Sequence, residues 1–206
     1  EAPKKEFFTM QSDGYTLNGY MLTPNDVVPS HKYPVIMYQY SGPQSQLVCN
    51  KWNMEWLNYV ATRGYIVMCV DGRGTGGRGK DFAALVYKQL GYYETIDQLA
   101  AARYAASLPY VDADRIGIFG WSYGGYMTIM AMTEKGNPYK AGVAVAPVTD
   151  WRMYDCIYTE RFMLSPQQNA IGYDSASTLN RVKNLSGNLL IVSGTADDNV
   201  HINNTY

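Results

Sequence analysis

A serine stands between glycines at Gly120-Trp121-Ser122-Tyr123-Gly124, where an apolar run ends and a helical pattern begins. A sharp strand-to-helix turn at such a G-x-S-x-G sequence holds the serine in strained backbone geometry. It leaves the hydroxyl at the edge of a sheet, beside the positive end of the helix. The pattern predicts that Ser122 is the nucleophile of an acyl-transfer reaction. The alternative is a glycine-rich turn whose serine has no chemical role.

A serine hydroxyl needs a base, a carboxylate that orients the base, and donors that stabilise an oxyanion. Asp197 and Asp198 follow a late apolar run, at the point in the chain order where α/β-hydrolases carry that carboxylate. Either aspartate could instead form a turn. The Tyr123 amide and the hydroxyl of Tyr40, which ends an early apolar run, are the candidate oxyanion donors. A tyrosine at a strand end more commonly serves packing.

The elements that must position these groups alternate along the chain. Short apolar runs bounded by turn residues indicate strands buried on both faces at 33–40, 64–72, 115–122, 141–147 and 188–195. Helical spacing lies between them at 50–63, 94–109 and 126–135, and a Ser-Asp-Gly turn indicates a hairpin within 7–24. This alternation predicts one α/β domain with a mostly parallel sheet and a site at the carboxyl ends of the strands.

Composition narrows the classes of function. The chain has 206 residues, of which 47% are hydrophobic, and a formal net charge of -1, whereas nucleic-acid binding needs a basic face. No apolar stretch approaches the roughly 20 residues of a membrane span. Three scattered cysteines and two histidines match neither a disulfide framework nor a metal centre. We therefore expect no nucleic-acid partner, no membrane contact from these residues and no cofactor.

A glycine-rich stretch after the second of the five apolar runs imitates two phosphate-binding loops. Gly72-x-Gly74-x-x-Gly77 matches a dinucleotide fingerprint, and the overlapping pattern that ends in Gly-Lys matches a P-loop. Asp81 replaces the magnesium-binding hydroxyl of the P-loop and would put a negative charge beside the phosphates. The dinucleotide pattern requires the first strand of its unit, whereas two apolar runs come earlier here. We therefore expect a flexible, solvated loop rather than a nucleotide site.

Six blocks, in order, resemble the prolyl oligopeptidase family of serine peptidases, most closely its dipeptidyl peptidase IV branch. They are YQYSGPQSQ, DGRGTGG, LGYYETIDQLAAARY, GWSYGGYMT, AVAPVTDWRMYDCIYTERFM and GTADDNVH. The resemblance implies an α/β-hydrolase fold with Ser122 as nucleophile and Asp197, rather than Asp198, as the triad carboxylate. It implies an oxyanion hole formed by the Tyr40 hydroxyl and the Tyr123 amide. It also implies peptide substrates, cleaved after proline or alanine through an acyl-enzyme.

The resemblance further implies a pocket for a proline side chain and a substrate carbonyl held by the Asn199 amide. The pocket residues are Val148, Trp151, Tyr154, Tyr158 and Val200. The spacing of the three aromatic residues is consistent with this, because steps of three and four place them on one face of a helical segment. A rigid aromatic box suits a pyrrolidine ring. Without the family, the same stripe would be interpreted as core.

The family pattern breaks at the histidine. The triad histidine of the family lies in a loop after the next strand, beyond Tyr206. His31 precedes the first of the five apolar runs, at the edge opposite Ser122, and the family does not use the histidine at His201 as the base. We therefore expect residues 1–206 to be an incomplete catalytic domain of a longer enzyme and to be inactive alone. They would lack the last strand and helix of the fold and the propeller domain of the family.

Two other functions stay open. An acylaminoacyl-type peptidase or an esterase on the same fold would not depend on the three aromatic residues for its preference between substrates. A non-catalytic binding fragment would keep the fold without turnover. The resemblance favours a periplasmic or cell-surface location and allows a homodimer of the full-length protein.

Overall fold

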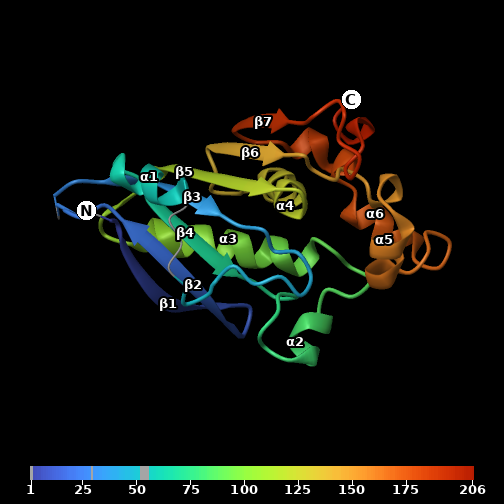
Figure 1. Ribbon diagram of the computed structural model, residues 1–206, viewed down its shortest axis with the longest axis horizontal. Helices are drawn as coiled ribbons and strands as arrows, with labels where there is room; N and C mark the ends of the chain where they lie inside the picture. The colour runs from blue at the N-terminus through green and yellow to red at the C-terminus, as the bar shows by residue number, and fades with distance from the viewer. Residues whose placement is uncertain (1, 29, 52–55) are drawn as a thin grey trace.

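One seven-stranded sheet forms the centre of the molecule in a computed structural model that describes residues 2–28, 30–51 and 56–206 (Figure 1). The strands are β1 (Lys4–Ser12), β2 (Tyr15–Thr23), β3 (Tyr33–Tyr38), β4 (Ile66–Asp71), β5 (Val111–Trp121), β6 (Ala141–Val145) and β7 (Asn188–Val192). Their order is β1-β2-β4-β3-β5-β6-β7. β2 pairs antiparallel with β1 and β4, and the other pairs are parallel. The predicted α/β class with a mostly parallel sheet is confirmed.

The helices are α1 (Trp56–Thr62), α2 (Lys80–Ala84), α3 (Tyr92–Ser107), α4 (Tyr123–Met132), α5 (Cys156–Met163) and α6 (Ala170–Ala176), with 3-10 turns η1 (Trp151–Met153), η2 (Thr178–Asn184) and η3 (Ile202–Asn204). α3 packs on β1, β4 and β5 and α4 on β5 and β6, whereas α1 packs on β2 and β4. In Figure 1, α5 and α6 lie beyond the arrowheads of the parallel strands. Across the described stretches, no helix is both long and apolar enough to span a membrane.

The three predicted helices are present, with shifted starts. α3 begins two residues and α4 three residues before the predicted helix. Residues 52–55 of the predicted 50–63 helix lie outside the described residues, and the described part is α1. The hairpin is also present, since β1 and β2 meet at a two-residue turn in which Asp13 and Gly14 have φ of 46° and 81°. Two positive φ values at an Asp-Gly pair match the twist of the flanking strands.

The sheet is less completely covered than the apolar runs predicted. Val35 of β3 and Ile116 of β5 are fully buried on the α3 side, while Ile36 and Phe119 are only half-buried on the other. β7 departs furthest from the prediction, because Leu190 is 57% exposed and Ile191 and Val192 after it are also exposed. β7 is the edge of the described sheet and pairs with β6 alone. An apolar run therefore predicts that a strand is present, but it does not predict whether helices cover one face of the strand or both.

The first half of the glycine-rich loop after β4 is buried, so the predicted solvated turn is wrong there. Arg73 is 1% exposed, and its guanidinium donates to Asp97 at 2.8 Å and to Asp13 at 2.9 Å. Asp97 also accepts from Ser12 Oγ at 2.6 Å. The loop, α3 and the β1–β2 hairpin are thus joined by one network of ion pairs and hydrogen bonds. Only residues 77–79, which end the loop before α2, are exposed.

Replacing Arg73 by Met is expected to lower the free energy of unfolding by about 3 to 5 kcal/mol, because Asp97 would be left as a buried charge without its partner. Urea denaturation measures the loss. The control is Arg115→Met, since Arg115 pairs with Asp112 at the surface and such pairs are worth about 1 kcal/mol or less. Equal effects of the two substitutions would contradict a structural role for the buried pair.

Candidate active site

The turn between β5 and α4 has the geometry of a nucleophile elbow. Ser122 has φ 56° and ψ -115°, a conformation that costs a non-glycine residue about 1 to 3 kcal/mol. A Cβ on Gly120 would collide with the Gly124 carbonyl and lie 2.6 Å from Gln39 Nε2, so the turn closes only over glycine. The Ser122 amide donates to the Val145 carbonyl at 2.8 Å, which fixes the elbow to the end of β6.

Seven of the predicted site residues surround one small pocket of about 20 Å³ at this elbow. They are Tyr40, Ser122, Tyr123, Val148, Trp151, Tyr154 and Tyr158. The Trp151 and Tyr158 rings stack at 6.0 Å between centroids, and the Tyr154 ring meets the Tyr158 ring edge-on at 5.5 Å. Trp151 is 2% exposed and packs in a core cluster with Val148. The aromatic stripe is therefore both core and pocket wall.

The aromatic residues converge without sharing a single helix, which corrects the sequence prediction. Trp151 lies in η1, Tyr154 follows it in an extended conformation, and Tyr158 belongs to α5. Two carboxylates cause the break: Asp150 accepts from the Arg152 amide at 2.8 Å, and Asp155 accepts from the Tyr158 amide at 2.7 Å. Each caps a new helical start, as short polar side chains do at N-caps.

The loop after β7 brings the remaining predicted residues to the same end of the sheet. Asp197 Oδ1 accepts from the amides of Asn199 and Val200 at 3.0 and 2.9 Å. Asn199 Oδ1 accepts from the Tyr154 hydroxyl at 2.8 Å, and Val200 packs in the core cluster that contains the pocket aromatics. Asp198 is exposed. Within the described residues, no hydrogen bond joins Asp197 to Ser122.

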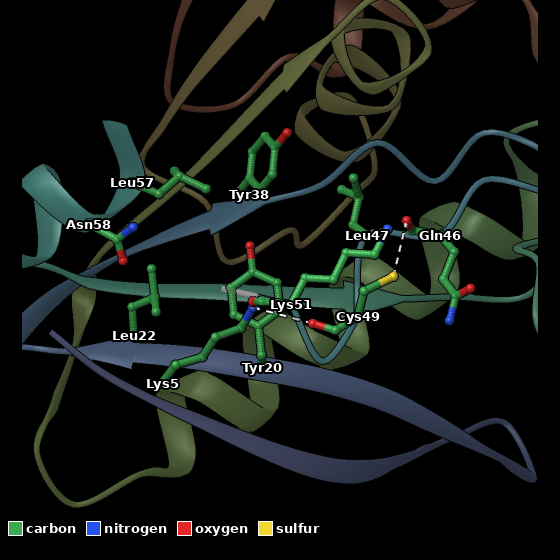
Figure 2. A pocket seen from close by; sticks show the side chains of 10 residues that line it. All are labelled: Lys5, Tyr20, Leu22, Tyr38, Gln46, Leu47, Cys49, Lys51, Leu57 and Asn58. Carbon is green, nitrogen blue, oxygen red and sulfur yellow. Dashed lines mark hydrogen bonds between the residues drawn. The ribbon is translucent and has the colours of Figure 1, made fainter. Parts of the chain in front are cut away.

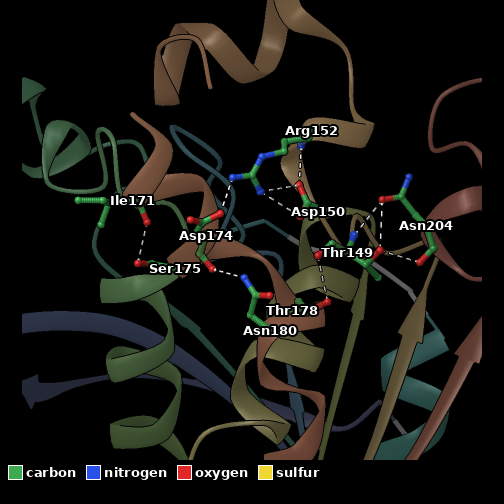
Figure 3. Close-up of polar contacts among 9 residues, drawn as sticks. All are labelled: Thr149, Asp150, Arg152, Ile171, Asp174, Ser175, Thr178, Asn180 and Asn204. Carbon is green, nitrogen blue, oxygen red and sulfur yellow. Dashed lines mark hydrogen bonds and ion pairs between the residues drawn. The ribbon is translucent and has the colours of Figure 1, made fainter. Parts of the chain in front are cut away.

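A buried clamp holds the loops after β6 and β7 together (Figure 3). Asn204 Oδ1 accepts from the Thr149 amide at 2.9 Å, and Thr149 Oγ1 donates to the Asn204 carbonyl at 2.8 Å. Arg152 adds an outer contact, because its guanidinium donates to Asp150 at 3.2 Å and to Asp174 of α6 at 2.5 Å. The pocket wall and the Asp197 loop are therefore parts of one hydrogen-bonded unit.

The loop after β3, which carries Tyr40, is fixed at its far end. The buried Asp71 carboxylate accepts from the amides of Leu47 and Val48 at 3.1 and 2.8 Å. Burial raises the pKa of Asp71, although these two amides act in the opposite direction. Figure 2 shows a second pocket beside this loop, where Lys5 reaches over the Tyr20 ring toward the backbone of residues 49–51.

A buried carboxyl lies behind the elbow. Glu94 in the first turn of α3 is fully buried, and its Oε1 accepts from the Tyr123 hydroxyl at 2.7 Å. Burial raises the pKa of Glu94 from 4.5 to about 7, although the hydrogen bond from Tyr123 opposes the rise. Its second oxygen has no hydrogen-bond partner among the described residues.

The contacts of His201 and His31 do not place either histidine as a base for Ser122. His201 is exposed, and its Nδ1 accepts from the Asn203 amide at 3.3 Å. His31 is exposed before β3, at the amino end of a strand parallel to β5, and so lies opposite the Ser122 edge. Over the described ranges, no three His, Cys, Asp or Glu side chains are grouped as a metal site.

The sequence reasoning missed the polar residues that support the site, above all Glu94, Gln98, Gln39 and Asn204. For the first two a signal was available. Glu94 and Gln98 occur on the face of α3 that continues with Ala101 and Ala105, and polar side chains on a face that packs against a sheet call for buried partners. Gln39 and Asn204 carried no such signal, because their partners come from distant segments.

Comparison with known proteins finds one family model, the prolyl oligopeptidase family, which matches residues 50–206. A "Probable dipeptidyl-aminopeptidase B" of Pyrenophora teres is 51% identical across the whole chain, which covers 23% of that protein. A protein of the same name from Phaeosphaeria nodorum is 48% identical, again with 23% covered. The crystal structure of Porphyromonas gingivalis dipeptidyl peptidase 4 superposes with a TM-score of 0.96 at 53% identity; all of this chain and 29% of that one are covered.

These matches bear out the α/β-hydrolase fold, since the superposition includes the sheet, the elbow and the loops around it. The chain spans about a quarter of the length of the curated relatives it matches.

Replacing Glu94 by Gln is expected to remove a pH-dependent loss of stability. The folded protein holds the Glu94 proton up to about pH 7, whereas the unfolded chain releases it near 4.5, so the stability of the parent falls as the pH rises through that window. The fall amounts to roughly 3 kcal/mol. Unfolding free energies at pH 5 and 8 measure it, with the surface substitution Glu6→Gln as the control. The same pH dependence in parent and Glu94→Gln would contradict the shift.

Proposed function

The chain belongs to the prolyl oligopeptidase family, and we propose from this premise that it forms the catalytic domain of a serine peptidase. The peptidase hydrolyses peptide bonds after proline or alanine through an acyl-enzyme. The observation that carries the proposal is the strained elbow at Ser122, which opens beside an aromatic pocket. Strain of this kind persists where the surrounding structure holds a residue in a conformation that its function requires.

In the proposed reaction, Ser122 Oγ attacks the carbonyl carbon of the scissile peptide bond while a histidine accepts the hydroxyl proton. The carbonyl electron pair moves onto oxygen, and the oxyanion accepts hydrogen bonds from the Tyr40 hydroxyl and the Tyr123 amide. The intermediate then expels the amine, which takes the proton from the histidine. Water hydrolyses the resulting ester by the same steps and frees Ser122.

The aromatic pocket supports the preference for proline. A pyrrolidine ring would lie against Trp151, Tyr154 and Tyr158, with Val148 and Val200 closing the sides, and the smaller alanine would also enter. Asn199 has its side-chain oxygen occupied by the Tyr154 hydroxyl. Its Nδ2 group is then the part that donates to a substrate carbonyl.

Asp197 is proposed as the triad carboxylate. Its Oδ1 accepts hydrogen bonds from two backbone amides. These bonds orient the carboxylate so that Oδ2 can accept a hydrogen bond from a histidine. We propose that this histidine lies outside residues 1–206, as the position of the triad histidine in the family implies. The contact of His201 Nδ1 with the Asn203 amide is consistent with this assignment. The full-length protein is then a dipeptidyl peptidase, the activity for which the matched relatives are named.

A fluorophosphonate probe is expected to label the full-length protein on Ser122, because among the serines of the described residues this one alone combines the elbow with candidate oxyanion donors. Peptide mass spectrometry locates the label. Ser122→Ala should lose the label, whereas Ser107→Ala, at an exposed serine of α3, should keep it. Labelling that survives in Ser122→Ala would refute the nucleophile. Absence of labelling in the unmodified protein would favour a non-catalytic binding role.

The full-length protein is expected to hydrolyse an Ala-Pro anilide, while residues 1–206 alone do so slower by a factor on the order of 10⁶. This is the loss that follows removal of the histidine from a serine triad. Release of the chromogenic aniline measures both rates, and His201→Ala in the full-length protein is the matched variant. Comparable turnover by residues 1–206, abolished by His201→Ala, would make His201 the base and refute our assignment.

A further inference from the structure

The face of α3 that packs on the sheet begins with polar side chains. Glu94, Asp97 and Gln98 are all fully buried, at spacings of three and four residues. Burying such groups costs free energy unless each finds a hydrogen-bond partner. Apolar residues would pack here without that cost. The hydrogen-bond partners of these three side chains therefore indicate which parts of the structure the polar face of α3 holds in position.

Glu94 holds the residue that follows the proposed nucleophile. Its carboxyl accepts from the Tyr123 hydroxyl at 2.7 Å, and Tyr123 is 2% exposed. The Tyr123 ring lies 6.1 Å from the Tyr40 ring and 5.3 Å from the Trp151 ring, between centroids. Because side chain and backbone of one residue move together, a fixed ring restricts the position of the Tyr123 amide.

Gln98, one turn further along α3, holds the loop that carries the other proposed donor. Its Nε2 donates to Ser41 Oγ at 3.2 Å and to the Val70 carbonyl at 3.0 Å. Ser41 Oγ in turn donates to Gln39 Oε1 at 3.1 Å. The residues on both sides of Tyr40 are therefore linked to α3.

The two links close into a ring. Gln39 Nε2 donates to the Gly124 carbonyl in the first turn of α4 at 2.7 Å, and Gly124 follows Tyr123 directly. Contacts thus run from Glu94 through Tyr123 and Gly124 to Gln39, Ser41 and Gln98, and back along α3. Asp97 is outside this ring, because it pairs with Arg73 and binds the hairpin.

We propose that Glu94 and Gln98 are positioning residues that set the separation between the Tyr40 hydroxyl and the Tyr123 amide, and with it the strength of the oxyanion hole. This inference rests on the proposed function. Oxyanion donors act at about 2.7 to 3.1 Å from the developing charge. A small displacement of either donor therefore reduces stabilisation of the transition state more than it reduces the affinity for the substrate.

The test compares two ligands on the full-length protein. A proline boronic acid forms a tetrahedral adduct with a serine and uses the oxyanion donors, whereas an aminoacyl pyrrolidide fills the pocket without forming an adduct. In Glu94→Leu and Gln98→Met, the affinity for the boronic acid is expected to fall about tenfold or more, the scale of one hydrogen bond to a charged group. The affinity for the pyrrolidide should change less than about twofold.

Two further variants keep the test decisive. Glu94→Gln retains an acceptor for the Tyr123 hydroxyl and should recover the affinity for the boronic acid to within about threefold of the parent; it also serves if Glu94→Leu does not fold. Glu6→Leu, the same substitution as Glu94→Leu at the surface of β1, should leave both affinities unchanged.

The inference would be overturned if the affinities for both ligands fell by the same factor, or if neither affinity changed. The proposed function fails differently, in that the parent would then bind the boronic acid no more tightly than Ser122→Ala does.

Discussion

The backbone of Ser122 is the constraint on which the rest of the site depends. Its positive φ turns the chain from β5 into α4 within one residue and leaves the side chain at the carboxyl edge of the sheet. The turn closes only because Gly120 and Gly124 have no Cβ to collide with each other or with Gln39. Holding a residue in this conformation costs free energy, and favourable contacts within the surrounding loops must offset that cost.

Those loops follow β3, β5, β6 and β7, and parallel pairing brings all four to one edge of the sheet. They are joined to one another by buried hydrogen bonds rather than by apolar contact alone. Asn204 joins the last two through Thr149, and Gln39 joins the first to α4. Hydrogen bonds of fixed length and direction set relative positions more sharply than packing does, which suits a site whose donors must converge on one reacting atom.

Much of this arrangement could be predicted from the sequence, because it rests on local signals. The elbow follows from the glycines around Ser122, and the parallel sheet follows from alternating apolar runs and helical spacing. What escaped prediction depends on residues far apart in the chain. The glycine-rich loop is buried because Arg73 meets Asp13 and Asp97, and Gln39 is fixed against α4 because it donates to the Gly124 carbonyl. Pairings of this kind leave no periodic pattern along the sequence.

The central claim is that Ser122 forms a covalent tetrahedral adduct whose oxygen is held by two fixed donors. A crystal structure of the full-length protein after reaction with a proline boronic acid tests it most directly. We expect boron bonded to Ser122 Oγ, one boronate oxygen within hydrogen-bond distance of both the Tyr40 hydroxyl and the Tyr123 amide, and the pyrrolidine ring against Trp151 and Tyr158. Boron bonded to another residue, or a boronate oxygen that meets neither donor, would contradict it.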